Sequence, residues 1–213
     1  MKFKRVLLCL VSIFLFSFGV SFTLKAAIGV GSWDAITQTV SDISRYQIGT
    51  VGIALNAICI LIQFVLLGKD FKFKHAMQVV LIVSLGYAIN FVYYDLLPDF
   101  TITSYPAKLF FLILGTAINA LAVSIVMLVD VVTFALEGAS LAIAKSLKMD
   151  FPLTRQIIDA VIIVITVILS LLFSTPLTVR EGTVIGMLIF SPLMGFFMKI
   201  LKPIFRKHDL TDQ

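Results

Sequence analysis

Residues 46–68 read YQIGTVGIALNAICILIQFVLLG and contain no Asp, Glu, Lys, Arg or His over 23 positions. A helix needs about 20 predominantly apolar residues to cross the hydrocarbon core of a bilayer. Five further charge-free runs of similar length occur along the chain: Val6–Leu24, Ala76–Tyr94, Leu109–Val129, Ala160–Val179 and Gly182–Met198. The runs are continuous rather than alternating, which favours helices over the strands of a transmembrane barrel. The sequence therefore predicts an all-α, polytopic membrane bundle with six transmembrane helices.

The composition of the whole chain agrees with a membrane protein. Of the 213 residues, 60% are hydrophobic and 14% are charged, and the mean hydropathy is +1.07. A soluble domain of this size needs more polar surface than this composition supplies. Soluble enzymes, secreted disulfide domains and disordered chains are therefore excluded. Cys9 and Cys59 lie in apolar runs, so we expect buried thiols rather than a disulfide.

The first apolar run is predicted to stay in the protein rather than to be removed as a signal peptide. The basic residues Lys2, Lys4 and Arg5 precede it, as in a signal peptide. However, the run is longer than the roughly 7–15 apolar residues of a signal sequence, and Lys25-Ala26-Ala27 is a poor cleavage site.

The basic residues predict the orientation of the chain. If the N-terminus is cytoplasmic and six helices alternate, 13 of the 17 Lys and Arg residues fall in cytoplasmic segments. The cytoplasmic group is Lys2, Lys4, Arg5, Lys69, Lys72, Lys74, Lys145, Lys148, Arg155, Lys199, Lys202, Arg206 and Lys207, and the external group is Lys25, Arg45, Lys108 and Arg180. This bias follows the positive-inside rule and predicts a multi-pass protein of the cell (inner) membrane with both termini in the cytoplasm. No nucleic-acid partner is expected, because juxtamembrane basic residues also favour the anionic lipids of the bilayer.

The two halves of the chain share an order of segments. A long connection follows the first run, Lys25–Arg45, and another follows the fourth, Asp130–Arg155, whereas the other connections are short. A shift of 103 residues places Asp34 on Glu137 and Asn56 on Asp159. We therefore expect two three-helix repeats. Because three is odd, the second repeat enters the membrane in the opposite direction, as in the inverted repeats of many secondary transporters.

This division leaves the chain as a single membrane domain, residues 1–213. Repeat one covers about 1–100, repeat two about 107–203, and a basic cytoplasmic tail 204–213.

Each long connection is predicted to contain a short helix. In the first, Gly29 and Gly31 end the preceding helix, and Ser32 is expected to cap a helix at about 33–45. The second is expected at 134–147, with small residues spaced for close helix packing. Both helices fit two interpretations. They are either amphipathic helices at the membrane surface, with Trp33 as an aromatic anchor, or re-entrant helices whose N-termini point into the membrane.

Several short motifs resemble the YczE/YyaS/YitT family of bacterial integral membrane proteins. The resemblance lies in Gly29-Val30-Gly31-Ser32-Trp33-Asp34, Ile48-Gly49-Thr50, Arg155, Gly182-Thr183 and Ser191-Pro192, and it extends over nearly the whole chain. The sequence departs from the family pattern in its second half. No Gly-Pro pair precedes Glu137, and the position four residues after Arg155, where the family often has Glu, is Asp159. The resemblance implies a multi-pass plasma-membrane protein and does not imply a substrate.

Polar residues in apolar surroundings are the candidates for a substrate or ion path. These are Asp34, Gln38, Asn56, Glu137 and Asp159. Charged groups in hydrocarbon are costly, so each calls for a partner or a function. For Asp159 the alternatives are a local ion pair with Arg155 and a proton or cation site. For the neutral amides Asn56, Asn90 and Asn119 we expect bonds between helices rather than a bound ligand. Inverted repeats are also expected to bring Asp34 and Glu137 together from opposite sides.

The sequence contains no recognisable catalytic, nucleotide-binding or metal-binding motif. We therefore expect neither an enzyme nor a cofactor or metal site. The preferred function is a small transporter or permease for an unidentified solute or ion, with a homo-oligomer as a compatible state. The alternative is a non-transporting membrane accessory protein that modulates another membrane protein or assembly.

Overall fold

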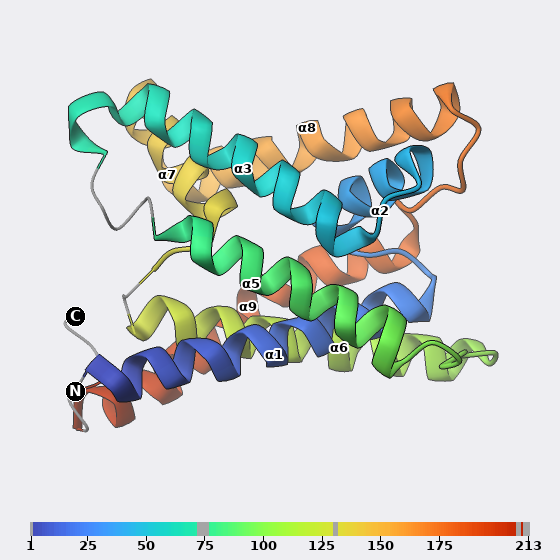
Figure 1. Ribbon diagram of the computed structural model, residues 1–213, viewed down its shortest axis with the longest axis horizontal. Helices are drawn as coiled ribbons and strands as arrows, with labels where there is room; N and C mark the ends of the chain where they lie inside the picture. Colours follow the sequence, from blue (N-terminus) through green and yellow to red (C-terminus); the bar gives the residue numbers. More distant parts are fainter. Residues whose placement is uncertain (1, 72–76, 130–131, 208–209, 211–213) are drawn as a thin grey trace.

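The computed structural model describes residues 2–71, 77–129, 132–207 and 210, and within these residues it contains helices and no strand (Figure 1). The α-helices are α1 (Lys2–Ala26), α2 (Ser32–Ser44), α3 (Ile48–Leu67), α5 (Gln78–Asn90), α6 (Tyr105–Val129), α7 (Ala135–Leu147), α8 (Phe151–Leu172) and α9 (Glu181–Lys207). A 3₁₀ turn, η1 (Gly68–Asp70), extends α3, and a π-helical turn, η2 (Phe91–Leu96), extends α5.

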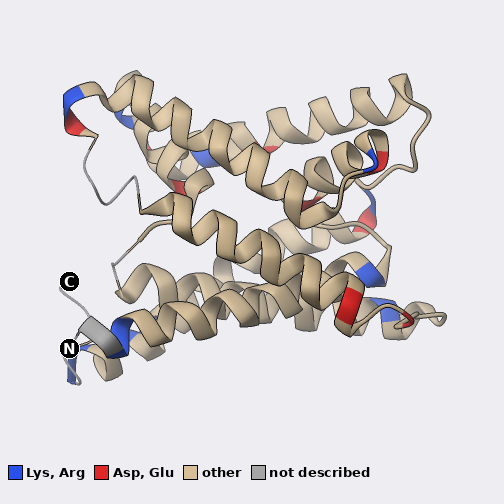
Figure 2. Cartoon of the chain, in the orientation of Figure 1, with Lys and Arg blue, Asp and Glu red and all other residues tan. Residues whose placement is uncertain are grey.

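Six of the described helical segments are long and apolar enough to cross a membrane. They are Lys4–Ala26, Ile48–Asp70, Gln78–Leu96, Tyr105–Val129, Phe151–Leu172 and Glu181–Lys207. Most Lys, Arg, Asp and Glu residues lie near the two ends of these helices (Figure 2). The prediction of an all-helical protein with six helices that can span a membrane is confirmed.

The predicted boundaries of the fifth transmembrane helix were wrong. The sequence placed it at Ala160–Val179, but α8 begins at Phe151 and ends at Leu172. Pro152 lies in the first turn, where a missing N–H costs nothing, and Arg155 pairs with Asp159 within the helix. The paired charges are therefore part of α8.

The sixth helix is longer than expected at its C-terminal end. It continues to Lys207 and includes both Pro192 and Pro203, so residues 204–207 of the predicted tail are helical. Of the rest of that tail, residues 208–209 and 211–213 lie outside the described part of the chain, as does Asp130 in the second long connection.

The packing of the bundle is centred on the antiparallel pair α1 and α6. Helix α5 packs on α1 and α9 packs on α6, whereas α3 and α8 lie in the other layer (Figure 1). Glycines permit the closest approaches. A Cβ atom at Gly115 would lie 2.6 Å from the Gly19 carbonyl oxygen, and one at Gly49 would overlap the Gly86 carbonyl oxygen. The α1–α6 and α3–α5 contacts therefore depend on residues without side chains.

The helices of the two halves begin at the same spacing. Four helices start at Lys2, Ser32, Ile48 and Gln78, and four others start 103 residues later, at Tyr105, Ala135, Phe151 and Glu181. In Figure 1 the corresponding helices α1 and α6 run in opposite directions, and so do α3 and α8.

Candidate functional site

The two short helices, α2 and α7, form the framework of the site. Gly29 has φ +110° and lies before α2, and the helix ends at Arg45 in a left-handed conformation with φ 65°. Helix α7 follows the extended residue Phe134 and ends at Lys148, with φ 54°. Each helix has 13 residues and is about 20 Å long at 1.5 Å per residue, too short to cross a hydrocarbon core of about 30 Å.

The N-terminus of α2 contacts α8 a little more than a third of the way along that helix. The Ser32 hydroxyl donates a hydrogen bond to Oδ1 of Asp159. Asp159 is the ninth of the 22 residues of α8, about 12 Å along its axis. Ser32 is not the predicted N-cap, because Gly31 takes that position and the serine hydroxyl bonds across to α8 instead.

Arg155 connects α7 to Asp159 of α8. Its Nη1 lies 2.7 Å from Asp159 Oδ1, and its Nη2 lies 3.9 Å from Glu137 Oε1 in the first turn of α7. The three side chains are largely buried, with exposed fractions of 17–23%. Ser32, Glu137, Arg155 and Asp159 thus form one group, the central polar cluster, which links the first turns of α2 and α7 through α8.

The other predicted path residues are less closely connected. Asp34 and Gln38 lie on successive turns of α2 and are partly buried. Asn56 donates to the Gly52 carbonyl of its own helix at 2.8 Å, so the expected bond between helices was wrong for this residue. Glu137 has Arg155 as its ion-pair partner, and its predicted convergence with Asp34 stays a prediction.

Gly29 and Gly182 hold the segment before α2 close to the start of α9. The Gly182 N–H donates to the Ile28 carbonyl at 2.8 Å, and a Cβ atom at Gly29 would lie 2.8 Å from the Thr183 nitrogen. These contacts fix the segment before α2 against the start of α9. Trp33 packs against the hydrophobic core.

Gly49 and Thr50 bind a side chain from α5. The Asn90 amide oxygen accepts from the Gly49 N–H at 2.7 Å, and its amide nitrogen donates to the Thr50 hydroxyl at 3.1 Å. The prediction that Asn90 bonds between helices is confirmed. Asn119 differs, because its Oδ1 is buried without a hydrogen-bond partner.

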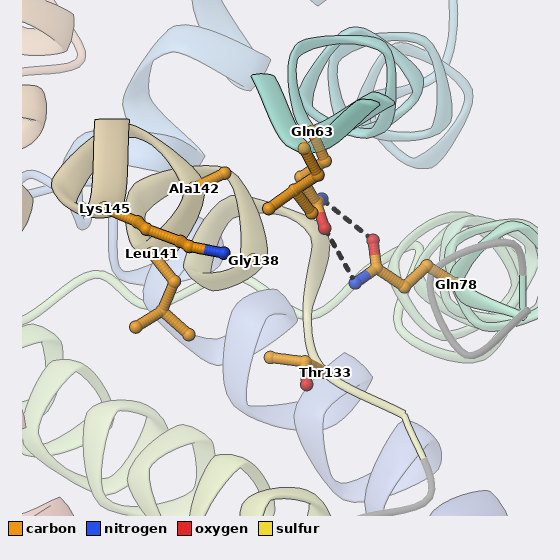
Figure 3. Close-up of a pocket in the computed structure, with 8 residues that line it drawn as sticks. Gln63, Gln78, Thr133, Gly138, Leu141, Ala142 and Lys145 are labelled. Carbon is orange, nitrogen blue, oxygen red and sulfur yellow. Dashed lines mark hydrogen bonds between the residues drawn. The ribbon is translucent and has the colours of Figure 1, made fainter. Parts of the chain in front are cut away.

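Sequence reasoning missed a cavity of about 300 Å³ between α3, α5 and α7 (Figure 3). Gln63 and Gln78 form a reciprocal amide pair at its wall, with N–O distances of 2.9 and 3.2 Å, and Gln63 also donates to the Ala135 carbonyl. Lys145 lines the cavity and binds Asp70 at 2.7 Å. Two glutamines inside otherwise apolar runs were the signal that could have indicated this site.

A second missed feature is a buried group of hydroxyls, Thr39, Ser170 and Thr178, which we name the hydroxyl cluster. Thr178 donates to the Ala35 carbonyl of α2 at 3.1 Å, so Thr39 is the donor in their 2.9 Å hydrogen bond. The Ser170 oxygen lies 3.5 Å from Thr39 Oγ1. These contacts join α2, α8 and the segment between α8 and α9. Most hydroxyls in apolar helices bond within their own helix, as Thr166 does, so the sequence gives little sign of those that bond across.

Near the C-terminal end of α2, partial burial raises the pKa of Asp42, and Arg45 opposes this shift. No group of three or more His, Cys, Asp or Glu side chains suited to a metal ion occurs in the part of the chain that the structure describes.

A family model described as a family of unknown function (DUF6198) matches residues 3–199, and the chain therefore belongs to this family. No curated protein and no solved structure matches the chain. The resemblance to the YczE/YyaS/YitT family stays a prediction.

Proposed function

We propose that this member of the DUF6198 family is a small membrane transporter built from two inverted repeats, with its transport site at the central polar cluster. The observation that carries the proposal is the ion pairing of Arg155 with both Glu137 and Asp159, combined with the hydrogen bond from Ser32 to Asp159. These contacts join both short helices part-way along a helix long enough to span the membrane.

The inverted repeat is supported by equivalent packing in the two halves. Helix α2 packs on α8, and its counterpart α7 packs on α3, the counterpart of α8. Likewise, α1 packs on α5 and α6 packs on α9. A two-fold axis in the membrane plane accounts for these pairs, for the opposite helix directions and for the shared spacing of 103 residues in the helix starts.

The re-entrant interpretation of α2 and α7 is supported by the depth of the cluster. If α8 spans the bilayer, Asp159 lies roughly a third of the way along it, and the first turn of α2 reaches that depth. A helix N-terminus there leaves backbone N–H groups that need polar partners. The surface interpretation leaves the contact between Ser32 and Asp159 unexplained.

The charges of the cluster favour a positively charged ion. Arg155 contributes one positive charge, and each helix N-terminus contributes about half a positive charge. Glu137 and Asp159 balance this sum, and Asp34 in the first turn of α2, beside the cluster, adds one negative charge when it is ionised. A surplus of about one negative charge in a low-dielectric region attracts a proton or another cation.

Transport is tested in two steps with purified protein. A thermal-shift screen of metabolites and inorganic cations in detergent identifies compounds that stabilise the wild type, because a ligand stabilises the state that binds it. Compounds that stabilise the wild type are then tested in radiolabelled form in proteoliposomes that contain a pH-sensitive dye. The label reports solute uptake, and the dye reports proton flux.

The variant Asp159→Asn is expected to abolish both the stabilisation and the flux. The matched control is Asp99→Asn, the same substitution at an exposed carboxylate after η2, away from the cluster. If Asp159→Asn remains folded and transports as well as the wild type, the proposed site is wrong. If the wild type shows no flux for any stabilising compound, the accessory role becomes the better interpretation.

A further inference from the structure

We propose that repeat one contains a binding site for a solute with a guanidinium group, formed by Asp34 and Asn56 at the place that the side chain of Arg155 fills in repeat two. This inference rests on the proposed function. It names the chemical class of the cation that the central polar cluster attracts, and it places that cation on residues beside the cluster.

The argument starts from the ion pairs of Arg155 in repeat two. This residue of α8 pairs with Glu137 of α7 and, at 2.7 Å, with Asp159 one turn further along α8. Helix α2 packs on α3 as α7 packs on α8. The residues at the corresponding positions of repeat one, 103 positions earlier, are Asp34 of α2 and Gly52 and Asn56 of α3. Repeat one therefore has two side chains with acceptor oxygens, and a glycine where repeat two has the cation.

The protein supplies no other cation to the carboxylate of Asp34. Helix α2 packs most closely on α8 and α3. The charged residues of α8 are Arg155 and Asp159, which bind each other, and α3 has no charged residue. On α2 itself, Asp42 and Arg45 lie at the other end of the helix. Among the described residues, none forms an ion pair or a hydrogen bond with the side chain of Asp34.

The amide of Asn56 leaves an oxygen available in the same region. Its nitrogen donates to the Gly52 carbonyl at 2.8 Å, and because a carbonyl oxygen only accepts, Oδ1 is the atom left to accept from another group. No donor to this oxygen occurs in the part of the chain that the structure describes. Asp34, Gly52 and Asn56 are partly buried, so they are shielded by the bundle without being closed off from small solutes.

Gly52 leaves the space that a long side chain occupies in repeat two. A Cβ atom at this position would have one neighbour within 4 Å, Cγ2 of Thr37 at 3.8 Å, which is an ordinary contact. At Gly49, in contrast, a Cβ atom would overlap the backbone of α5. Asp34 is also one methylene group shorter than its counterpart Glu137, which widens the gap further. Gly52 is therefore a position at which a group from outside the chain can take the place of an arginine side chain.

The ligands of the site favour a guanidinium group over other cations. A guanidinium ion is planar, has several N–H donors and forms two parallel hydrogen bonds with one carboxylate. Ions such as Mg²⁺ and Ca²⁺ take six or more oxygen ligands, whereas the site offers one carboxylate and one amide oxygen. An ammonium group is a compact and strongly hydrated charge, and it matches a carboxylate less well. The same preference is visible in repeat two, where the cation between the equivalent side chains is a guanidinium group.

Radiolabelled guanidinium ion tests the site without a transport assay. Its binding to the purified protein in detergent is measured by scintillation proximity in a buffer that contains excess K⁺. Burial raises the pKa of Asp34 to about 7, so the measurement is made at about pH 8.5, where the carboxylate is ionised. We expect saturable binding to the wild type that unlabelled guanidinium displaces and that Na⁺ or tetramethylammonium at the same concentration does not. Asp34→Asn should weaken the binding at least tenfold, and the exposed control Asp99→Asn should leave it unchanged.

Gly52→Arg tests the correspondence between the two repeats. Its side chain should fill the site as Arg155 does in repeat two, and the variant should bind labelled guanidinium at least tenfold more weakly than the wild type. Addition of Asp34→Asn should lower the unfolding temperature of Gly52→Arg, because the new arginine loses its partner, and should not lower that of the wild type. Gly52→Ala is the control and should bind as the wild type does, because its methyl group meets only Thr37. If Gly52→Arg is not monodisperse, Gly52→Gln fills the same space without a charge and should also lose the binding.

Absence of saturable binding to the wild type would overturn the inference, and so would wild-type binding by Asp34→Asn. Displacement of the label by Na⁺ as effective as that by guanidinium would overturn the assigned class of ligand. A folded Gly52→Arg or Gly52→Gln protein with wild-type binding would contradict the position of the site. None of these results depends on transport. Binding without flux would contradict the proposed function alone, whereas flux of another compound that Asp159→Asn abolishes would support the proposed function without this site.

Discussion

Arg155 is the residue whose loss should disturb the centre of the molecule most. It lies between two carboxylates that belong to α7 and α8, and all three side chains are largely buried. If Arg155 is removed, two carboxylates remain without their cation, and a buried charge without a partner costs more than the pair contributed. Arg155 therefore stabilises the fold as well as the proposed site.

We predict strong coupling between Arg155 and Asp159. Arg155→Gln and Asp159→Asn should each lower the free energy of unfolding. The decrease in the double variant should be smaller than the sum of the two single decreases, by a coupling energy of roughly 0.5–3 kcal/mol. Chemical or thermal unfolding in detergent measures all four proteins of the cycle. The exposed pair of Lys145 and Asp70 is the control, for which a coupling of about 1 kcal/mol or less is expected. Additive effects at Arg155 and Asp159 would show that the two charges act independently.

At the scale of elements, the start of α2 depends on a backbone that other residues do not adopt readily. Gly29 has φ +110° and lies against Thr183, and Gly31 is the N-cap of α2. If α1 continued beyond Ala26, the first turn of α2 would not reach Asp159. The break between the two helices is thus a condition for the central polar cluster.

Replacement of Gly29 and Gly31 together by leucine is expected to lower stability and to abolish any transport activity. The positive φ disfavours a side chain at Gly29, and the added Cβ would overlap the Thr183 nitrogen. Size-exclusion profiles and thermal unfolding of the double variant measure the effect on folding. Full stability together with wild-type flux would mean that the break has no role.

The contact between α3 and α5 should be equally sensitive to a single methyl group. At Gly49 a Cβ atom would overlap the backbone of Gly86, and backbone atoms cannot move aside cheaply. We expect Gly49→Ala to lower the unfolding temperature by several degrees. Gly195→Ala in α9 is the matched control, because nothing lies within 4 Å of its Cβ position and alanine favours a helix by up to about 1 kcal/mol. Equal stability of the two variants would contradict the close approach of α3 and α5.

The sequence predicted the elements well where one physical signal dominated. The apolar runs predicted six long helices, and the two glycines predicted the start of α2 to within a residue. The boundary of α8 was wrong because charges were taken as the end of the apolar segment, whereas Arg155 and Asp159 neutralise each other within the helix. The role of Ser32 was wrong because a local capping bond competes with a partner 127 residues away.

Contacts between distant segments were the part of the site that the sequence did not predict. The local pair of Arg155 and Asp159 follows from their spacing of four residues, but the contact from Arg155 to Glu137 depends on how α7 packs on α8. The pairing of Gln63 with Gln78 depends on the packing of α3 on α5 in the same way. A single sequence shows which polar residues need a partner in the bundle. It does not show which residue of another helix is that partner.

For the whole molecule, the orientation in the membrane rests on the distribution of basic residues. Without Arg155, which lies within α8, the cytoplasmic group still contains 12 of the 17 Lys and Arg residues, and a strong bias of this kind directs the insertion of short connections. Because α3 and α5 cross the membrane one after the other, the C-terminal end of α3 and the C-terminal end of η2 must face opposite sides of the membrane. Lys69, just after α3, and Asp99, just after η2, are exposed residues that report on these two sides.

Cysteine labelling in intact cells is expected to place Asp99→Cys outside and Lys69→Cys inside. Both variants are made in the Cys9→Ser/Cys59→Ser background, so that the native thiols cannot react. A membrane-impermeant maleimide should label position 99 in intact cells, and position 69 only after permeabilisation. A permeant maleimide applied to the same cells is the control, because it should label both positions if both are accessible. The reverse pattern would contradict the orientation, and labelling of both positions from outside would also contradict the inverted repeat. In the latter case α5 and η2 would not cross the bilayer, and the central polar cluster would lose the membrane depth on which the transport proposal depends.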